Sequence, residues 1–153
     1  MFEKLSSIQK LGQALQAQCP DWRIRLIHNF EPEASGDYLR EIMHETPAFP
    51  LVYARVEVPL ETYRAFEAQL STLGERSIGD AFLFLRDDVA REAFVMREID
   101  VSSPFYDCIK VHLKEEGPFV ARASIFKVGG HPLTIAEFFG KRALTVLGLD
   151  RSK

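Results

Sequence analysis

Two charged residues stand in stretches of sequence that are otherwise apolar, and both have side chains that can do chemistry. Arg40 lies in the segment DYLREIMHE, and Glu137 lies in HPLTIAEFF. Alternation along a strand puts Arg40 on one face with Tyr38 and Ile42, and it puts Glu137 on a face that is otherwise apolar. A buried charge is costly unless a partner compensates it. We therefore expect both side chains to face the interior or a pocket.

The types of these two side chains suit a ligand that carries a carboxylate. An Arg keeps its charge when it is dehydrated, and its planar fork of donors matches a carboxylate group. Desolvation raises the pKa of a buried carboxyl group unless a nearby cation offsets the effect, and both states are useful in a site. For Glu137 the alternative is a structural ion pair, or a frayed strand end near Gly140. Both readings of Glu137 stay open at this point.

Strand-like patterns surround both candidate residues. Glu41 points to the face opposite its charged neighbour, and Arg55 in the following strand is its expected partner. The pair Gly129-Gly130 separates two apolar runs and predicts a tight hairpin, with Glu137 on its second arm. The expected strands span residues 22–30, 37–45, 51–59, 93–101, 119–128 and 131–139.

Helical periodicity marks the segments between these strands. Apolar residues recur at helical spacing from Leu5 to Leu15, and Pro20 closes the run, which predicts a helix of about four turns. The other expected helices are 60–74, ending at Gly74, and a short one after Ser77, with Asp80 in capping-box spacing. The segment SSPFYDCIKVHLKEEG suits either a short helix or a strand. The sequence thus predicts an α+β fold, a mostly antiparallel β-sheet with helices packed on one face.

Composition narrows the class of protein and of partner. The 153 residues are 46% hydrophobic and 27% charged, which predicts a single domain spanning residues 1–153. A net charge of −3 and scattered Lys and Arg residues argue against a nucleic-acid partner. No apolar window of about 20 residues and no signal sequence occur, so we expect a cytoplasmic protein with no membrane partner.

The standard motifs of catalysis and metal binding are absent. There is no Walker-type loop, no dinucleotide Gly fingerprint and no nucleophile elbow. The four His residues are dispersed without ligand spacing, so a metal site is not expected. Cys19 and Cys108 are far apart, and we expect both to be reduced thiols.

Three blocks of the sequence resemble the bacterial chorismate pyruvate-lyases. The first joins YLREI to LVYARVEVP, and the second is LSTLGERSIGDAFLF. The third is ARASIFKVGGHPLTIAEFF, which is similar to the family's Arg-Arg-Ser strand, Gly-containing turn and final Glu-containing strand. Together the blocks cover about two-thirds of the chain, from Tyr38 to Phe139 with an interruption.

The resemblance implies a specific activity and fold. The family converts chorismate to 4-hydroxybenzoate and pyruvate without cofactor or metal, at the entrance to ubiquinone biosynthesis. Its fold is an antiparallel sheet with helices on one side, enclosing a small internal site under flaps. Arg40 and Glu137 match its charged site residues, and Ile78 matches a position that contacts the substrate through the main chain. Arg40 would orient a substrate carboxylate, and Glu137 would act as general acid or general base, the two roles remaining open.

The sequence also departs from the family's pattern. The segment before Tyr38 is shorter, and the stretch that supplies a flap residue is not found, so the lid is expected to differ. Residues 102–118 are additional, Val120 replaces an expected aromatic residue, and Ala123 replaces an Arg. These changes bear on the choice of substrate and on the product isomer.

The partner implied is a small-molecule substrate, chorismate or a similar dicarboxylate, and we expect a monomer or a small homo-oligomer. The alternative function is a non-catalytic module that binds an aromatic acid, because effector-sensing domains of transcription regulators share this fold. Such regulators carry an N-terminal DNA-binding domain. Here one predicted helix precedes the first strand, which is too short for a helix-turn-helix unit.

Overall fold

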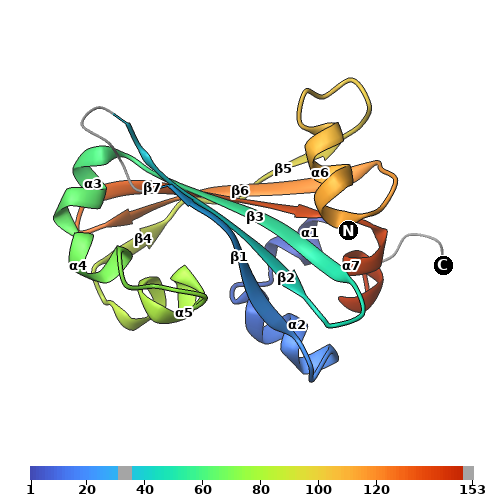
Figure 1. Cartoon of the computed structure of the whole chain (residues 1–153), viewed down its shortest axis with the longest axis horizontal. Coiled ribbons are helices and arrows are strands. Elements are labelled where there is room, and N and C mark those ends of the chain that lie inside the picture. The colour runs from blue at the N-terminus through green and yellow to red at the C-terminus, as the bar shows by residue number, and fades with distance from the viewer. Residues whose placement is uncertain (31–35, 150–153) are drawn as a thin grey trace.

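A seven-stranded antiparallel sheet forms the centre of the molecule (Figure 1), in a computed structural model that describes residues 1–30 and 36–149. The strand order is β1-β2-β3-β7-β6-β4, and β5 pairs with the same edge of β6 as β4 does. The strands are β1 (Arg23–Phe30), β2 (Tyr38–Glu45), β3 (Pro50–Val58), β4 (Val89–Arg91), β5 (Val95–Ile99), β6 (Phe119–Val128) and β7 (His131–Phe139). The predicted α+β class is confirmed, and each expected strand is present.

Helices cover one face of this sheet at its two ends. The helices at one end are α1 (Phe2–Ser6), α2 (Leu11–Gln18) and α7 (Lys141–Val146). Those at the other end are α3 (Leu60–Ala65), α4 (Glu67–Leu70), α5 (Ile78–Ala81) and the 3-10 turn η1 (Leu83–Leu85). Strand residues of even number on β3, such as Val52 and Val56, pack into these two groups. In Figure 1, α2 of the first group and α4 and α5 of the second lie below the strands.

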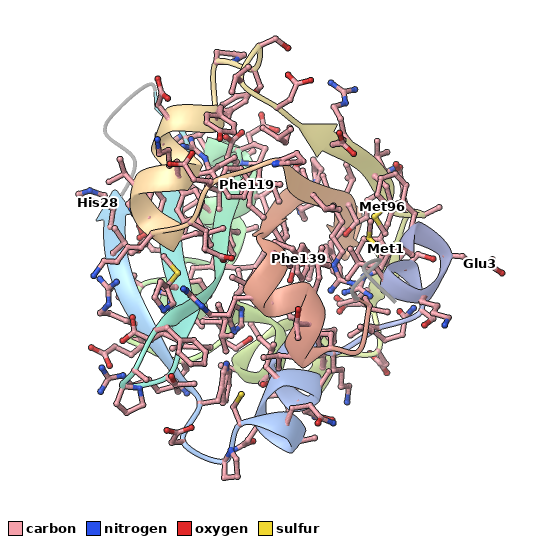
Figure 2. The ribbon with its side chains drawn as sticks, turned by 90° about the vertical axis from the view of Figure 1, so that its right-hand side faces the viewer. Met1, Glu3, His28, Met96, Phe119 and Phe139 are labelled. Atoms are coloured by element: carbon pink, nitrogen blue, oxygen red, sulfur yellow. The ribbon has the colours of Figure 1, made fainter. Side chains whose placement is uncertain are left out.

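The opposite face of the sheet carries one helix of the described chain, α6 (Tyr106–Leu113), which lies above the sheet in Figure 1. This is the segment for which the sequence left helix and strand open. Its Ile109 and Leu113 pack on Tyr53 and Phe138, which alternate with the residues of the first face. Phe119 and Phe139 illustrate the two sides: Figure 2 labels both, and they belong to different hydrophobic clusters.

The hairpin between β6 and β7 forms as the glycine pair predicts. Gly129 and Gly130 have φ angles of +53° and +84°, in the left-handed region that glycine adopts without a Cβ clash. The resulting register pairs Arg122 with Glu137 across the two strands. The turn chemistry therefore determines which side chain stands beside Glu137.

The predicted N-terminal helix is broken in two, and Arg122 supplies the reason. Its Nη1 donates hydrogen bonds to the carbonyl oxygens of Leu5 and Ile8, each at 2.8 Å. In a continuous helix those two carbonyls would accept from N–H groups four residues later along the chain. A buried guanidinium takes that role here, and α1 ends before α2 begins.

The predicted helix 60–74 is also interrupted, at Phe66, whose φ of −127° and ψ of 27° are not helical. The Phe66 ring packs edge-on against Phe82, with 5.4 Å between ring centres. The expected short helix after Ser77 is confirmed, since Ser77 Oγ accepts from Gly79 N at 3.1 Å. Helix α7 and strand β4 were not predicted. No helix within residues 1–30 and 36–149 has the length and apolar character needed to cross a membrane.

Candidate functional site

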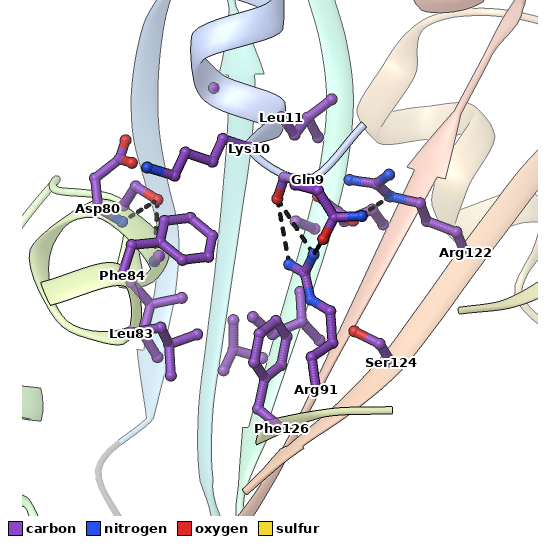
Figure 3. Close-up of a pocket in the computed structure, with 18 of the residues that line it drawn as sticks. Gln9, Lys10, Leu11, Asp80, Leu83, Phe84, Arg91, Arg122, Ser124 and Phe126 are labelled. Carbon is purple, nitrogen blue, oxygen red and sulfur yellow. Dashed lines mark hydrogen bonds and ion pairs between the residues drawn. The ribbon is translucent and has the colours of Figure 1, made fainter. Parts of the chain in front are cut away.

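A cavity of about 60 Å³ lies on the helix-covered face of the sheet, between the two groups of helices (Figure 3). Its floor consists of alternate residues on β2, β3, β6 and β7, including Ile42, Ala54 and Glu137. One wall is the turn between α1 and α2, and the opposite wall is formed by α5 and η1. Five charged residues line it, namely Lys10, Arg91 and Arg122 as cations and Asp80 and Glu137 as anions, so its net charge is +1.

Glu137 is bound to Arg122 in this cavity. The Nε atom of Arg122 donates to Oε1 of Glu137 at 2.6 Å, and both side chains are buried. The Arg122 guanidinium also lies over the ring of Phe94, with 4.3 Å from Cζ to the ring centre. The cation of Arg122 therefore compensates the buried charge of Glu137, which would otherwise be costly.

Arg91 brings a second guanidinium to the same cavity, from the short strand β4. It donates from Nη1 to the side-chain oxygen of Gln9 at 2.8 Å and stacks on Phe126, with 4.5 Å from Cζ to the ring centre. Its Nε is buried and has no hydrogen-bond partner in the described part of the chain. Burial, and then the charge of Arg122, lower the pKa of Arg91. An anionic group in the cavity would relieve both effects.

Ile78, the first residue of α5, is also part of the cavity wall and is buried. The Ser77 hydroxyl occupies the N–H groups of Gly79 and Asp80. The N–H of Ile78 donates no hydrogen bond within the described residues, so it is available to a ligand. This availability suits the main-chain contact expected at Ile78.

Arg40 is buried on the predicted face of β2, and it stands behind the cavity wall. Its Nη2 donates to the carbonyl oxygens of Gly74 and Arg76, both at 2.8 Å, and thereby holds the loop that leads into Ile78. Its Nε finds no partner among the described residues, and burial lowers the pKa of its guanidinium. Ile78 and Glu137 thus line the cavity, whereas Arg40 is not among the lining residues.

Glu41 points to the opposite face of the sheet, as predicted, but its hydrogen bond does not come from Arg55. The hydroxyl of Tyr53 donates to Glu41 Oε2, and Arg55 stands directly opposite Glu41 in the register of β2 and β3. A tyrosine two residues along β3 reaches the carboxylate because it shares the same face. Arg55 still interacts with Glu41 through its charge, since the Glu41 carboxylate is one of the groups that raise the pKa of Arg55.

His44 also lies on the inner face of β2, two residues beyond Ile42, and it was not predicted as a site residue. His44 Nδ1 accepts from the indole N–H of Trp22 at 3.2 Å, and the two rings are stacked with 5.8 Å between centres. Burial, and then the charge of Arg122, lower the pKa of His44 to about 4. Alternation from Arg40 through Ile42 was the signal that could have identified it. Arg122 could have been found in the same way on β6, whereas the short β4 gave no signal for Arg91.

A larger hollow of about 690 Å³ lies on the other face of the sheet. Its floor is made of Ala121, Ala123 and Ala136, and none of the three predicted site residues lines it. The charged cavity is therefore the candidate site. Within residues 1–30 and 36–149 no cluster of three or more His, Cys, Asp or Glu side chains could hold a metal ion.

Comparison with known proteins agrees with the resemblance seen in the sequence. Residues 12–145 match the family described as chorismate lyase. A protein of Thiobacillus denitrificans named "probable chorismate pyruvate-lyase" is 30% identical over 92% of this chain and 82% of its own length. A protein of Psychromonas ingrahamii with the same name is 27% identical over 91% of this chain and 81% of its own length.

A solved structure shares the fold. The C-terminal domain of the histidine utilization repressor from Pseudomonas syringae pv. tomato superposes with a TM-score of 0.56 and 15% sequence identity. The match covers 78% of this chain and 90% of that one. At this level of identity the likeness concerns the fold alone.

Proposed function

The chain belongs to the chorismate lyase family, and from this premise we propose that it is a carbon–oxygen lyase that converts chorismate to 4-hydroxybenzoate and pyruvate. The observation that carries the proposal is the Arg122–Glu137 ion pair inside a cavity of net positive charge. Chorismate is a dicarboxylate, so the cationic side chains favour its entry, and the carboxylate of Glu137 can serve the chemistry. The product would supply the aromatic ring for ubiquinone biosynthesis.

The reaction breaks the ether bond between the ring and the enolpyruvyl group. The ring loses the proton at the carbon that bears the hydroxyl group, and the electron pair of that C–H bond completes the aromatic ring as enolpyruvate departs. Enolpyruvate takes up a proton and becomes pyruvate. Glu137 is held beside a cation as a carboxylate, and a carboxylate accepts protons, so we assign it the removal of the ring proton. Aromatisation supplies much of the driving force, and positioning in a dry cavity supplies the rest.

In this proposal Arg40 and Ile78 bind a carboxylate once the cavity has widened, because Arg40 lies behind the wall of the closed cavity. Arg40 Nε and the N–H of Ile78 both lack an acceptor within the described residues. Two unsatisfied N–H groups and a guanidinium charge match the two oxygens of one substrate carboxylate. Arg91 and Arg122 are the cations available to the second carboxylate.

The cavity must widen before chorismate can enter, because sites for small molecules usually enclose about 300–1,000 Å³. The cavity here encloses about 60 Å³. Its two walls are close in Figure 3, where Lys10 of one wall lies over Phe84 of the other, with 5.3 Å from Nζ to the ring centre. We assign the role of flaps to the turn between α1 and α2 and to the segment of α5 and η1.

Incubation of the purified protein with chorismate tests the proposal. We expect equimolar 4-hydroxybenzoate and pyruvate, and we expect both to be lost in Arg40→Ala and Glu137→Ala. Binding of chorismate without turnover would leave a non-catalytic binding module as the function. Turnover that is unchanged in both variants would show that the assigned site residues are wrong, and a different hydroxybenzoate isomer would overturn the substrate orientation.

A further inference from the structure

His44 lines the cavity and has one of its two ring nitrogens without a hydrogen-bond partner in the described part of the chain. Along β2 it follows Arg40 and Ile42 on the same face, and its side chain is buried at the floor of the cavity. In the strand register His44 pairs with Val52 of β3, and Val52 pairs with Phe139 of β7. The next inward-facing set of paired residues is Ile42, Ala54 and Glu137. The imidazole is therefore a neighbour of the Arg122–Glu137 pair on the side of α2.

The hydrogen bond from Trp22 determines the tautomer of His44. An indole N–H is a donor only, so His44 Nδ1, which receives it at 3.2 Å, must be an unprotonated acceptor. In the neutral imidazole the proton then resides on Nε2. The stacked Trp22 ring keeps the imidazole in this orientation.

The Nε2–H group of His44 has no acceptor in the described part of the chain. Residues 1–30 and 36–149 contain no acceptor for Nε2, and Nε2 is not one of their completely enclosed side-chain atoms that lack a partner. Because His44 is a lining residue, we infer that Nε2 opens toward the cavity. A core histidine with a purely structural role would have both nitrogens satisfied.

We propose that His44 is a specificity-determining residue of this site, which donates a hydrogen bond from Nε2 to the ligand oxygen that lies farthest from Arg40. The inference rests on the proposed function, because that function gives the ligand a carboxylate at the Arg40 end. His44 is four positions after Arg40 on the strand, which places their Cα atoms about 13 Å apart. In the widened cavity, a ring held by its carboxylate at the Arg40 end presents its 4-oxygen to His44.

The charge state of the imidazole agrees with this role. The low pKa of His44, caused by burial and by the charge of Arg122, leaves the ring neutral at pH 7. A neutral ring with Nδ1 occupied and Nε2 protonated donates a hydrogen bond but removes no proton. His44 is thus distinct from Glu137, which carries the proton transfer.

Two variants of His44 distinguish the role of Nδ1 from the role of Nε2. The amide oxygen of Asn reaches the place of Nδ1 and can still accept from Trp22, so His44→Asn removes the cavity donor and keeps the structural bond. The amide nitrogen of Gln reaches the place of Nε2, so His44→Gln restores a donor. We expect His44→Asn to weaken 4-hydroxybenzoate binding about tenfold and His44→Gln to remain within about threefold of the wild type. Benzoate, which lacks the 4-oxygen, should bind the wild type and His44→Asn equally well.

Titration calorimetry of 4-hydroxybenzoate and benzoate with the full chain measures these affinities, and circular dichroism checks that each variant is folded. If His44→Asn weakens both ligands alike, or neither, the inference fails while the lyase proposal stands on turnover by the wild type. If the wild type neither binds 4-hydroxybenzoate nor turns over chorismate, both fail.

The tautomer provides a readout that needs no ligand. Long-range ¹H–¹⁵N NMR of the histidine rings should show the Nε2–H form of His44 at pH 7, and Trp22→Phe should give a mixture of tautomers. An Nδ1–H form or an imidazolium in the wild type would overturn the inference whatever the ligand results.

Discussion

Arg122 and Glu137 are partners in register across the β6–β7 hairpin, and Arg122 Nε donates to Glu137 Oε1 at 2.6 Å within the cavity. The same guanidinium binds two carbonyl oxygens of the N-terminal segment. One side chain thus compensates the proposed catalytic base and fixes a wall of the site.

The first prediction concerns the stability of this pair. Arg122→Met leaves the buried carboxylate of Glu137 without its cation, and removal of one partner of a buried pair costs about 3–5 kcal/mol. Chemical denaturation at pH 7 measures the free energy of unfolding. The double variant Arg122→Met/Glu137→Leu should be more stable than the single one, because no charge is then left unpaired. A double variant as unstable as the single one would show that the carbonyl contacts, and not the ion pair, matter.

The second prediction concerns catalysis. Glu137→Gln keeps the size of the side chain and removes the proton acceptor, so kcat should fall about 10²–10⁴-fold, the usual contribution of a general base. Chorismate turnover followed at saturating substrate gives kcat. The matched control is Glu57→Gln, an exposed carboxylate on the opposite face of β3, which should leave kcat within about twofold.

The third prediction concerns substrate binding by Arg91. Its buried Nε lacks a hydrogen-bond partner among the described residues, and burial lowers its pKa. An anionic ligand would accept a hydrogen bond from Nε and would raise the pKa again. Arg91→Gln should therefore raise KM for chorismate about tenfold, with a smaller change in kcat. Arg97→Gln is the control, because Arg97 lies on the neighbouring strand β5 and lines the hollow on the other face. If both substitutions raise KM equally, Arg91 acts only through the net charge of the protein and does not contact the substrate.

The fourth prediction is a pH dependence of stability. The pKa of His44 falls from its ordinary value of 6.5 to about 4 on folding, because of burial and then of the charge of Arg122. Between these values the unfolded chain binds a proton that the folded chain does not. The contribution of His44 is therefore complete above pH 6.5 and is lost as the pH falls toward 4, by about 3 kcal/mol in all.

Comparison of the wild type with His44→Asn isolates this contribution. Burial also lowers the pKa of His112, but that residue is present in both proteins and its effect cancels. Urea denaturation between pH 4.5 and pH 7 should show a difference in unfolding free energy that changes with pH. A constant difference would mean that His44 titrates alike in both states.

Features that depend on neighbouring residues were predictable from the sequence. The Gly129-Gly130 turn and the cap of α5 by Ser77 follow from local chemistry, and alternation assigned Arg40 and Glu137 to the inner face. The break between α1 and α2 was not predictable, because it depends on Arg122, more than a hundred residues away in the chain. Arg91 was missed for a related reason: β4 is too short for a pattern and exists by pairing with β6.

The contact of Arg122 with Leu5 and Ile8 also determines when the N-terminal segment can fold during synthesis. The first ten residues leave the ribosome long before the strand that fastens them, so their final conformation must wait for the C-terminal hairpin. Contacts of such sequence separation form late and slow folding. A nascent chain arrested before β6 should therefore leave its N-terminus open to proteases, whereas release of the finished chain should protect it.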